Sequence, residues 1–114
     1  MPSVALEDPR ELEIRALLAQ SDSYSASRYP PESQHQADIG SLTAANVRFF
    51  AARSAGAAVG CGALVIGNDG TAELKRMFVD PAARGKGIGQ ALLQAIEVAA
   101  FDEGVRLIRL ETGT

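Results

Sequence analysis

Between Arg84 and Gly89 the sequence reads RGKGIG, which places three glycines and two cationic side chains within six residues. The segment follows an apolar run and precedes a long pattern of helical period, so it is expected to join a strand to the start of a helix. The first N–H groups of a helix have no intrahelical acceptor, and the helix dipole adds partial positive charge there. Glycine allows a ligand to approach these N–H groups closely. The pattern therefore predicts a site for a phosphate or pyrophosphate group.

Two common nucleotide motifs do not fit this segment. The nicotinamide dinucleotide motif G-x-G-x-x-G fails because the position of its third glycine holds Gln90. The P-loop of nucleoside triphosphatases needs Ser or Thr after Gly-Lys, and Lys86 is followed by Gly87. A purely structural alternative is a tight strand-to-helix connection, for which one or two glycines would be enough.

The elements around this segment predict an α+β fold with a mixed, mainly antiparallel sheet. Strand patterns cover residues 3–6, 47–52, 57–66 and 71–79, with turn signals at 54–56 and 67–70. A helix is expected from Pro9 to about Gln20, with Asp8 as its N-cap and Glu11 completing a capping box. Residues 21–46 form a long irregular connection, in which short helices are expected after Pro31 and near Ser41.

The C-terminal third predicts a crossover of the β-loop-α-β type. A helix is expected from about Gly87 to Glu103, with an apolar stripe formed by Ile88, Leu92, Ile96 and Ala99 or Ala100. Gly104 is a typical helix stop. Residues 105–111 are then expected to form a strand parallel to residues 71–79.

Composition narrows the class of protein. The 114 residues suit a single domain, and 46% hydrophobic residues argue against disorder. The net charge of −3 favours neither nucleic acid nor an anionic membrane as a partner. Cys61 is the only cysteine, so the chain has neither an intramolecular disulfide nor the cysteine spacing of a zinc site, and no metal is expected. Cys61 is interpreted as a small apolar strand residue. Neither a signal peptide nor an apolar stretch of about 18 residues is found, which predicts a cytoplasmic protein.

Residues 74–93, LKRMFVDPAARGKGIGQALL, resemble motif A of the GNAT N-acetyltransferase superfamily. Arg84, Gly87 and Gly89 match the core of that motif, [R/Q]-x-x-G-x-[G/A]. The preceding strand, its Asp80-Pro81 exit and the following helix are similar to the family's order of elements. The antiparallel meander and the N-terminal helix extend the resemblance over nearly the whole chain, which looks like a bacterial member.

The resemblance implies acetyl-CoA as cosubstrate. Its pyrophosphate would lie on the backbone N–H groups of Arg84, Gly85, Lys86, Gly87, Ile88, Gly89 and Gln90. Its pantetheine arm would run along Met77, Phe78 and Val79 like an added strand. The strand at 105–111 would diverge from that strand and open a slot for the acetyl thioester.

Transfer of an acetyl group to an amine needs a base that removes a proton from the ammonium form. Glu73 is the candidate, because some family members carry a catalytic glutamate on this strand. By alternation Glu73 should share a face with Lys75, Met77 and Val79. Glu73 is otherwise a solvated carboxylate paired with Lys75 or Arg76, in which case ordered water could serve instead.

The irregular connection supplies candidates for the acceptor side. His35 is the only histidine and could act as a base, although a lone loop histidine is more often an exposed polar residue. Tyr24, Tyr29 and His35 could instead line a pocket for the acceptor. The acceptor is expected to be a small-molecule or peptide primary amine.

The resemblance also implies a further helix and a final hairpin after the last strand, so the chain is expected to be C-terminally incomplete. The strand at 105–111 would then be an exposed edge, which a second copy could cover in a homodimer. The predicted function is an N-acetyltransferase. Two alternatives stay open, a CoA-binding or assembly module without turnover, and transfer of a longer acyl group.

Overall fold

Three long strands form the centre of an antiparallel meander, as the sequence predicts. They belong to one five-stranded sheet in the order β1-β2-β3-β4-β5. The computed structural model describes residues 2–26 and 39–110. The strands are β1 (Ser3–Leu6), β2 (Val47–Ser54), β3 (Ala57–Ile66), β4 (Thr71–Val79) and β5 (Leu107–Leu110). Among the described strands only β4 and β5 pair in parallel, which confirms the mixed, mainly antiparallel α+β sheet and its crossover.

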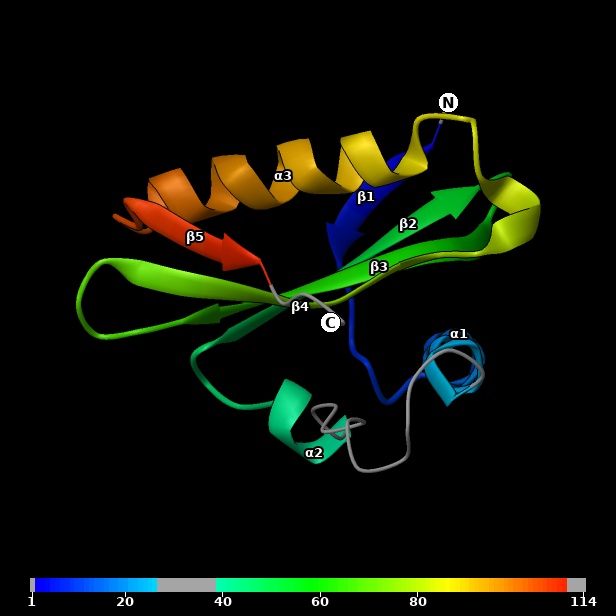
Figure 1. The fold of residues 1–114 in the computed structure, drawn as a ribbon, viewed down its shortest axis with the longest axis horizontal. Coiled ribbons are helices and arrows are strands. Elements are labelled where there is room, and N and C mark those ends of the chain that lie inside the picture. Colours follow the sequence, from blue (N-terminus) through cyan, green and yellow to red (C-terminus); the bar gives the residue numbers. More distant parts are fainter. Residues whose placement is uncertain (1, 27–38, 111–114) are drawn as a thin grey trace.

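Helices cover both faces of the sheet (Figure 1). Helix α3 (Ile88–Asp102) lies on one face, and α1 (Leu12–Ala26) and the short α2 (Ile39–Leu42) lie on the other. The alternation of the strands supplies apolar side chains to both layers, because Phe50 belongs to the α3-side core and Phe49 to the α1-side core. The sheet is therefore buried on both faces and gives a rigid base to the segments at its ends.

Two glycines of β3 let α3 approach the sheet closely. A Cβ atom added at Gly60 would lie 3.0 Å from Leu92 Cδ1 and 3.2 Å from the carbonyl oxygen of Phe78. A Cβ atom added at Gly62 would lie 3.1 Å from Ile96 Cδ1. The short residues of β3 thus fix the height of α3 above the sheet, and with it the position of the loop that precedes α3.

The first helix differs from the sequence-based prediction at both ends. It begins at Leu12 rather than Pro9, because the carboxylate of Asp8 accepts hydrogen bonds from the backbone and side chain of Arg10 and does not cap the helix. The predicted capping box is therefore wrong. The Arg10 side chain lowers the pKa of Asp8 to about 2. Helix α1 continues to Ala26 instead of ending near Gln20, since Ser21 is buried against the sheet.

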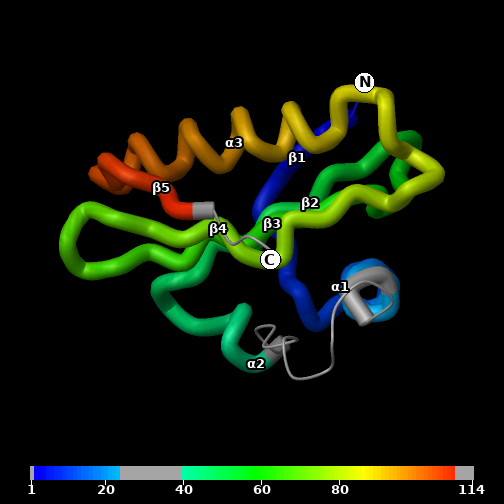
Figure 2. Tube along the Cα trace, viewed as in Figure 1, coloured from blue at the N-terminus to red at the C-terminus, as the bar shows by residue number. Residues whose placement is uncertain are grey.

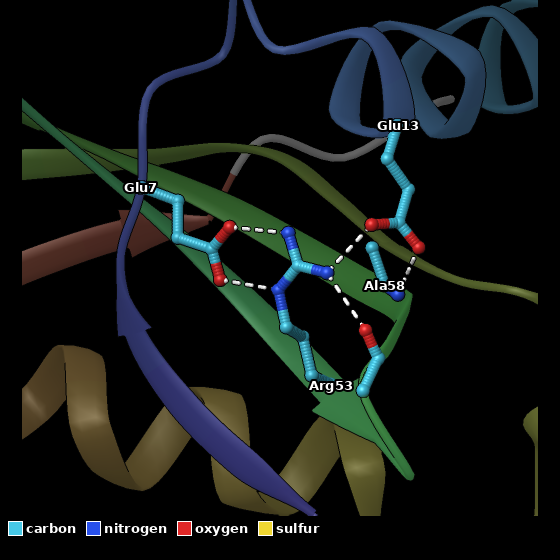
Figure 3. Close-up of polar contacts among 5 residues, drawn as sticks. Glu7, Glu13, Arg53 and Ala58 are labelled. Carbon is cyan, nitrogen blue, oxygen red and sulfur yellow. Dashed lines mark hydrogen bonds and ion pairs between the residues drawn. The ribbon is translucent and has the colours of Figure 1, made fainter.

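Arg53 joins β1, α1 and the β2–β3 turn (Figure 3). Its guanidinium binds both carboxylate oxygens of Glu7, at 2.7 and 2.9 Å, and one oxygen of Glu13 at 2.6 Å. The second oxygen of Glu13 accepts the N–H of Ala58, and Gly56 offers its carbonyl oxygen to Arg53. These contacts lower the pKa of Glu13, chiefly through the Ala58 hydrogen bond, and raise the pKa of Arg53. The network fixes the start of α1 relative to the sheet.

The remaining boundaries follow the prediction closely. The meander turns are as expected, α2 lies near Ser41, and β2 extends to Ser54. Helix α3 ends before Gly104, and the N–H of Val105 bonds to the carbonyl of Ala100 at 2.9 Å. Strand β5 therefore starts at Leu107 rather than at 105. The helix expected after Pro31 falls outside the described residues, and within those residues no helix is long and apolar enough to span a membrane.

Alanine substitutions in β3 should test the close packing of α3. Gly60→Ala should lower the free energy of unfolding by about 1–3 kcal/mol, because the backbone oxygen of Phe78 cannot move away easily. Gly62→Ala should cost less, since its nearest neighbours are the flexible ends of side chains. Urea unfolding of both variants measures the difference, and equal stability of the two would contradict this account.

Candidate functional site

The loop between β4 and α3 is built from a short, well-anchored turn (Figure 2). The N–H of Asp80 bonds to Val59 at 2.8 Å, and its carboxylate accepts the N–H of Ala82 at 3.0 Å. This arrangement starts a single 3-10 turn, η2 (Pro81–Ala83), whose last residue is buried under α3. The chain consequently leaves β4 in a fixed direction and reaches α3 at one end of the sheet.

Gly85 and Gly87 adopt conformations that favour glycine. Their φ angles are 82° and 77°, in the left-handed region that other residues rarely occupy. A Cβ atom added at either position would meet nothing within 4 Å. Glycine is therefore favoured here by the positive φ angles and not by a lack of space. Both positions are open to solvent. Gly87 is the N-cap of α3 and offers no side chain to its N–H groups.

Within the described part of the chain, the backbone N–H groups of residues 85–90 donate no hydrogen bond. The first N–H with an intrahelical acceptor belongs to Ala91, which bonds to Gly87 at 3.0 Å. The exposed Lys86 adds a positive charge, and the Arg84 side chain bonds through Nε to the last carbonyl of β4 at 3.2 Å. Free N–H groups, a helix N-terminus and cationic side chains together form an arrangement suited to an anion.

The three other residues predicted to bind the pyrophosphate, Ile88, Gly89 and Gln90, form the start of α3. The Ile88 side chain is buried in the α3-side core, so only its N–H faces the loop. Gly89 has no positive φ, and an added Cβ would lie 3.8 Å from Val79 Cγ2, an ordinary contact. Gln90 is exposed on the first turn of α3.

Strand β4 contains a β-bulge just before the loop. Cys61 lies opposite Phe78, whereas Ala63 lies opposite Lys75, so one fewer residue separates the pair in β3 than in β4. Arg76, inside the bulge, has a φ of 58°, a conformation that costs an L-residue roughly 1–2 kcal/mol. The alternation of side chains is shifted from this point to the end of the strand.

The bulge corrects the predicted environment of Glu73. Leu74, Met77 and Val79 pack on the α3 side, whereas Phe78 is buried on the α1 side. Glu73 points away from α3 with Lys75, so the prediction that it shares a face with Met77 and Val79 is wrong. Glu73 is exposed, opposite Val65 on β3 and Arg109 on β5. Its predicted pairing with Arg76 is also wrong, because Arg76 binds Asp22.

The part of β5 that the structure describes pairs with β4 up to the bulge. Their parallel register covers only four positions, from Thr71 opposite Leu107 to Leu74 opposite Leu110. Residues 77–79 therefore have no partner strand on this side within the described part of the chain, although β3 pairs with the other edge. The opening predicted between these strands would begin beyond Leu110, outside the described residues, and stays a prediction.

The two acceptor-side candidates, Tyr29 and His35, lie outside the described residues, and so does the side chain of Tyr24. The pair that the sequence analysis missed is Arg76 and Asp22, which bond at 2.5 Å between β4 and α1. Two consecutive charged residues, Lys75 and Arg76, interrupt the alternating pattern of β4 and are the signal that could have indicated a bulge.

Cys61 is buried, as the sequence predicts, and burial raises the pKa of its thiol to about 12. The thiol lies 3.2 Å from the carbonyl oxygen of Arg76 and donates a hydrogen bond to it. The contact is to the bulge itself. Cys61 therefore belongs to the support of β4 and not to its reactive surface.

A separate open hollow of about 360 Å³ lies at the other end of the sheet, between the β1–α1 connection and the start of β2. Its charged side chains are already engaged in ion pairs, since Glu7 binds Arg53, Arg10 binds Asp8 and Arg48 binds Glu103. No charged side chain of this hollow is left for a ligand. The loop at residues 84–90 is the better supported site.

Known proteins have sequences and folds similar to those of this chain. A sequence model described as the acetyltransferase (GNAT) family matches residues 12–114. The IAA acetyltransferase of Azospirillum brasilense is 42% identical over 116 residues, which cover 99% of this chain and 76% of that protein. A Klebsiella pneumoniae crystal structure, classed with the acyl-CoA N-acyltransferases, has a TM-score of 0.78 at 34% identity and covers 98% of this chain and 72% of that one.

A more distant structure, the PaiA N-acetyltransferase of Thermoplasma acidophilum in complex with coenzyme A, has a TM-score of 0.75 at 20% identity. The match covers 98% of this chain and 79% of that one. At 20% identity, the similarity supports a shared fold and nothing more specific.

The glycines of the loop should respond differently to alanine. Gly87→Ala should lower the free energy of unfolding by about 1 kcal/mol, because an L-residue is strained at its positive φ. Gly89→Ala should leave stability unchanged or raise it by up to about 1 kcal/mol, since alanine favours the helix and only ordinary contacts form. Urea unfolding compares the two, and the reverse order would refute the conformational role assigned to Gly87.

Proposed function

The chain belongs to the acetyltransferase (GNAT) family of acyltransferases, and from this premise we propose that it binds acetyl-CoA at residues 84–90 and acetylates a primary amine. The observation that carries the proposal is the row of free N–H groups at residues 85–90, at a helix N-terminus with no side-chain cap. A pyrophosphate offers several acceptor oxygens to such a row, and its charge suits the helix dipole. Gly85 and Gly87 leave the approach open.

The pantetheine arm of acetyl-CoA follows the free edge of β4 in this proposal. The backbone of residues 77–79 is paired with β3 on one side, so its other edge can accept an added extended chain. Met77 and Val79 pack toward α3, and Phe78 is buried toward α1, which keeps this edge straight between two packed layers. The thioester then lies in the opening predicted between β4 and β5.

The reaction transfers the acetyl group from sulfur to nitrogen. A neutral amine attacks the thioester carbonyl, a C–N bond forms, the C–S bond breaks, and the CoA thiolate takes up a proton. The ammonium form of the acceptor must first lose a proton to a base. We assign this role to Glu73, directly or through water, because it lies on β4 next to Leu74, the last residue that pairs with the described part of β5.

The choice of acceptor is left to experiment. The relative from Azospirillum brasilense is named an IAA acetyltransferase, so IAA belongs in the test panel beside amino acids, small amines, aminoglycosides and peptide N-termini. Propionyl-CoA and succinyl-CoA, tested against acetyl-CoA, separate acetyl transfer from transfer of a longer acyl group. Binding of acetyl-CoA without turnover of any acceptor would contradict the transferase function proposed for this chain.

Binding at the loop is tested by calorimetric titration with acetyl-CoA, with NAD and ATP as comparison ligands. Gly87→Asp should weaken acetyl-CoA binding by about tenfold or more, because it brings a carboxylate to the proposed pyrophosphate position. The matched control is Gly56→Asp, which places the same side chain at a glycine with a φ of 86° and open surroundings in the β2–β3 turn. Equal affinity in the two variants would exclude the loop as the cradle.

The role of Glu73 is tested by kinetics. Glu73→Gln should lower kcat by about 10²-fold and remove the acidic limb of the pH–rate profile, because the amide cannot accept the proton. The affinity for acetyl-CoA should hardly change. Glu97→Gln, which alters an exposed carboxylate on α3, is the control. An unaltered pH–rate profile in Glu73→Gln would remove this residue from the mechanism.

A further inference from the structure

Arg76 is the residue inside the bulge of β4, and its side chain is almost completely buried. Only 3% of the side chain is exposed, and a φ of 58° places its backbone in the left-handed region. A buried guanidinium needs partners, because desolvation of an unpaired charge is strongly unfavourable. The partners of Arg76 therefore indicate what holds the bulge in place.

Those partners come from α1 and β3. Arg76 Nη1 donates to Asp22 Oδ1 at 2.5 Å, and Nη2 donates to the carbonyl of Leu18 at 3.3 Å. The backbone of the same residue is held from β3, since its carbonyl oxygen accepts the Cys61 thiol at 3.2 Å. The bulge is thus fixed by its side chain on one helix and by its carbonyl on the neighbouring strand.

The bulge lies directly before the part of β4 that belongs to the proposed site. Residue 76 lies between residues 71–74, which pair with the described part of β5, and residues 77–79, whose edge away from β3 is the proposed path of the pantetheine arm. The direction in which β4 leaves the bulge sets the position of that edge. A side chain that holds the bulge also fixes the backbone along which the thioester arm is proposed to lie.

We infer that Arg76 and Asp22 form a positioning pair that holds the bulge, and thereby aligns the free edge of β4 for transfer of the acetyl group. This inference rests on the proposed function. Neither residue is assigned contact with acetyl-CoA or the acceptor. The pair acts through the backbone, so its loss should affect the alignment of the reacting groups more than the binding of the pyrophosphate, which depends on residues 85–90.

A plain stabilising role is the alternative, and the chain offers a matched control for it. Arg48 and Glu103 form a second ion pair, at 2.7 Å, between residues almost equally far apart in the sequence. It joins β2 to the end of α3, away from the bulge and the loop. Asp22 is half exposed and Glu103 is one-third exposed, so both accept an amide without a new clash.

The experiment compares Asp22→Asn with Glu103→Gln. Asp22→Asn should lower kcat by about tenfold or more, because small misplacements of reacting groups reduce rates strongly. Its dissociation constant for acetyl-CoA should change by less than about threefold, because the loop is untouched. Asp22→Glu keeps the carboxylate and should recover most of kcat. Glu103→Gln should change neither quantity.

Amide hydrogen exchange of residues 75–78, measured without ligand, reports directly how stably the bulge is held. Exchange should be about tenfold faster in Asp22→Asn and unchanged in Glu103→Gln. Arg76→Lys, which keeps the charge but not the two-pronged contact, should also accelerate it. Unchanged exchange in Asp22→Asn, or equal losses of kcat in Asp22→Asn and Glu103→Gln, would overturn the inference.

Failure of the positioning role can be distinguished from failure of the proposed function. If the wild-type chain binds acetyl-CoA and turns over an acceptor, but Asp22→Asn does so at the same kcat, the positioning role is wrong and the proposed function stands. If the wild type neither binds nor turns over, the proposed function is wrong. In that case, faster exchange in Asp22→Asn would show that the Arg76–Asp22 pair holds the bulge. It would still overturn the role of the pair in acetyl transfer.

Discussion

Within β4 the backbone passes through a left-handed residue, and the chain uses a buried guanidinium to keep it there. Arg76 is tied to Asp22 and Leu18 on α1, and its carbonyl is tied to Cys61 on β3. From this point the side-chain alternation of β4 is shifted, so Met77 and Val79 face α3 while Phe78 faces α1. The edge of β4 at residues 77–79 and the start of the glycine loop both follow from the path that the strand takes after the bulge.

Glycine serves two different purposes around this site. Gly60 and Gly62 have no side chain because α3 packs at contact distance above β3. Gly85 and Gly87 have free space around them, and there the positive φ is what requires glycine. The first pair sets the height of the helix, and the second pair directs the N–H groups at its N-terminus. An anion site of this kind needs both, because helix position and loop direction together decide where the N–H groups point.

The membership of the acetyltransferase (GNAT) family gives this geometry its chemical meaning. The N–H groups of the loop suit an anion, but a row of N–H groups does not distinguish one pyrophosphate ligand from another. In the proposed function, the family connects the anion to acetyl-CoA, and the edge of β4 at residues 77–79 carries the thioester arm.

By itself the sequence determined the meander, the crossover and the loop, because hydrophobic period, turn residues and the RGKGIG glycines act within a few residues of one another. It predicted the wrong bounds for α1, and it wrongly placed Glu73 on the same face of β4 as Met77 and Val79. The polar end of α1 is helical because Ser21 is buried and Asp22 binds Arg76. Asp22 and Arg76 are 54 positions apart in the chain. Only the tertiary structure decides such features, since a bulge or a helix extension held by distant side chains leaves no local period in the sequence.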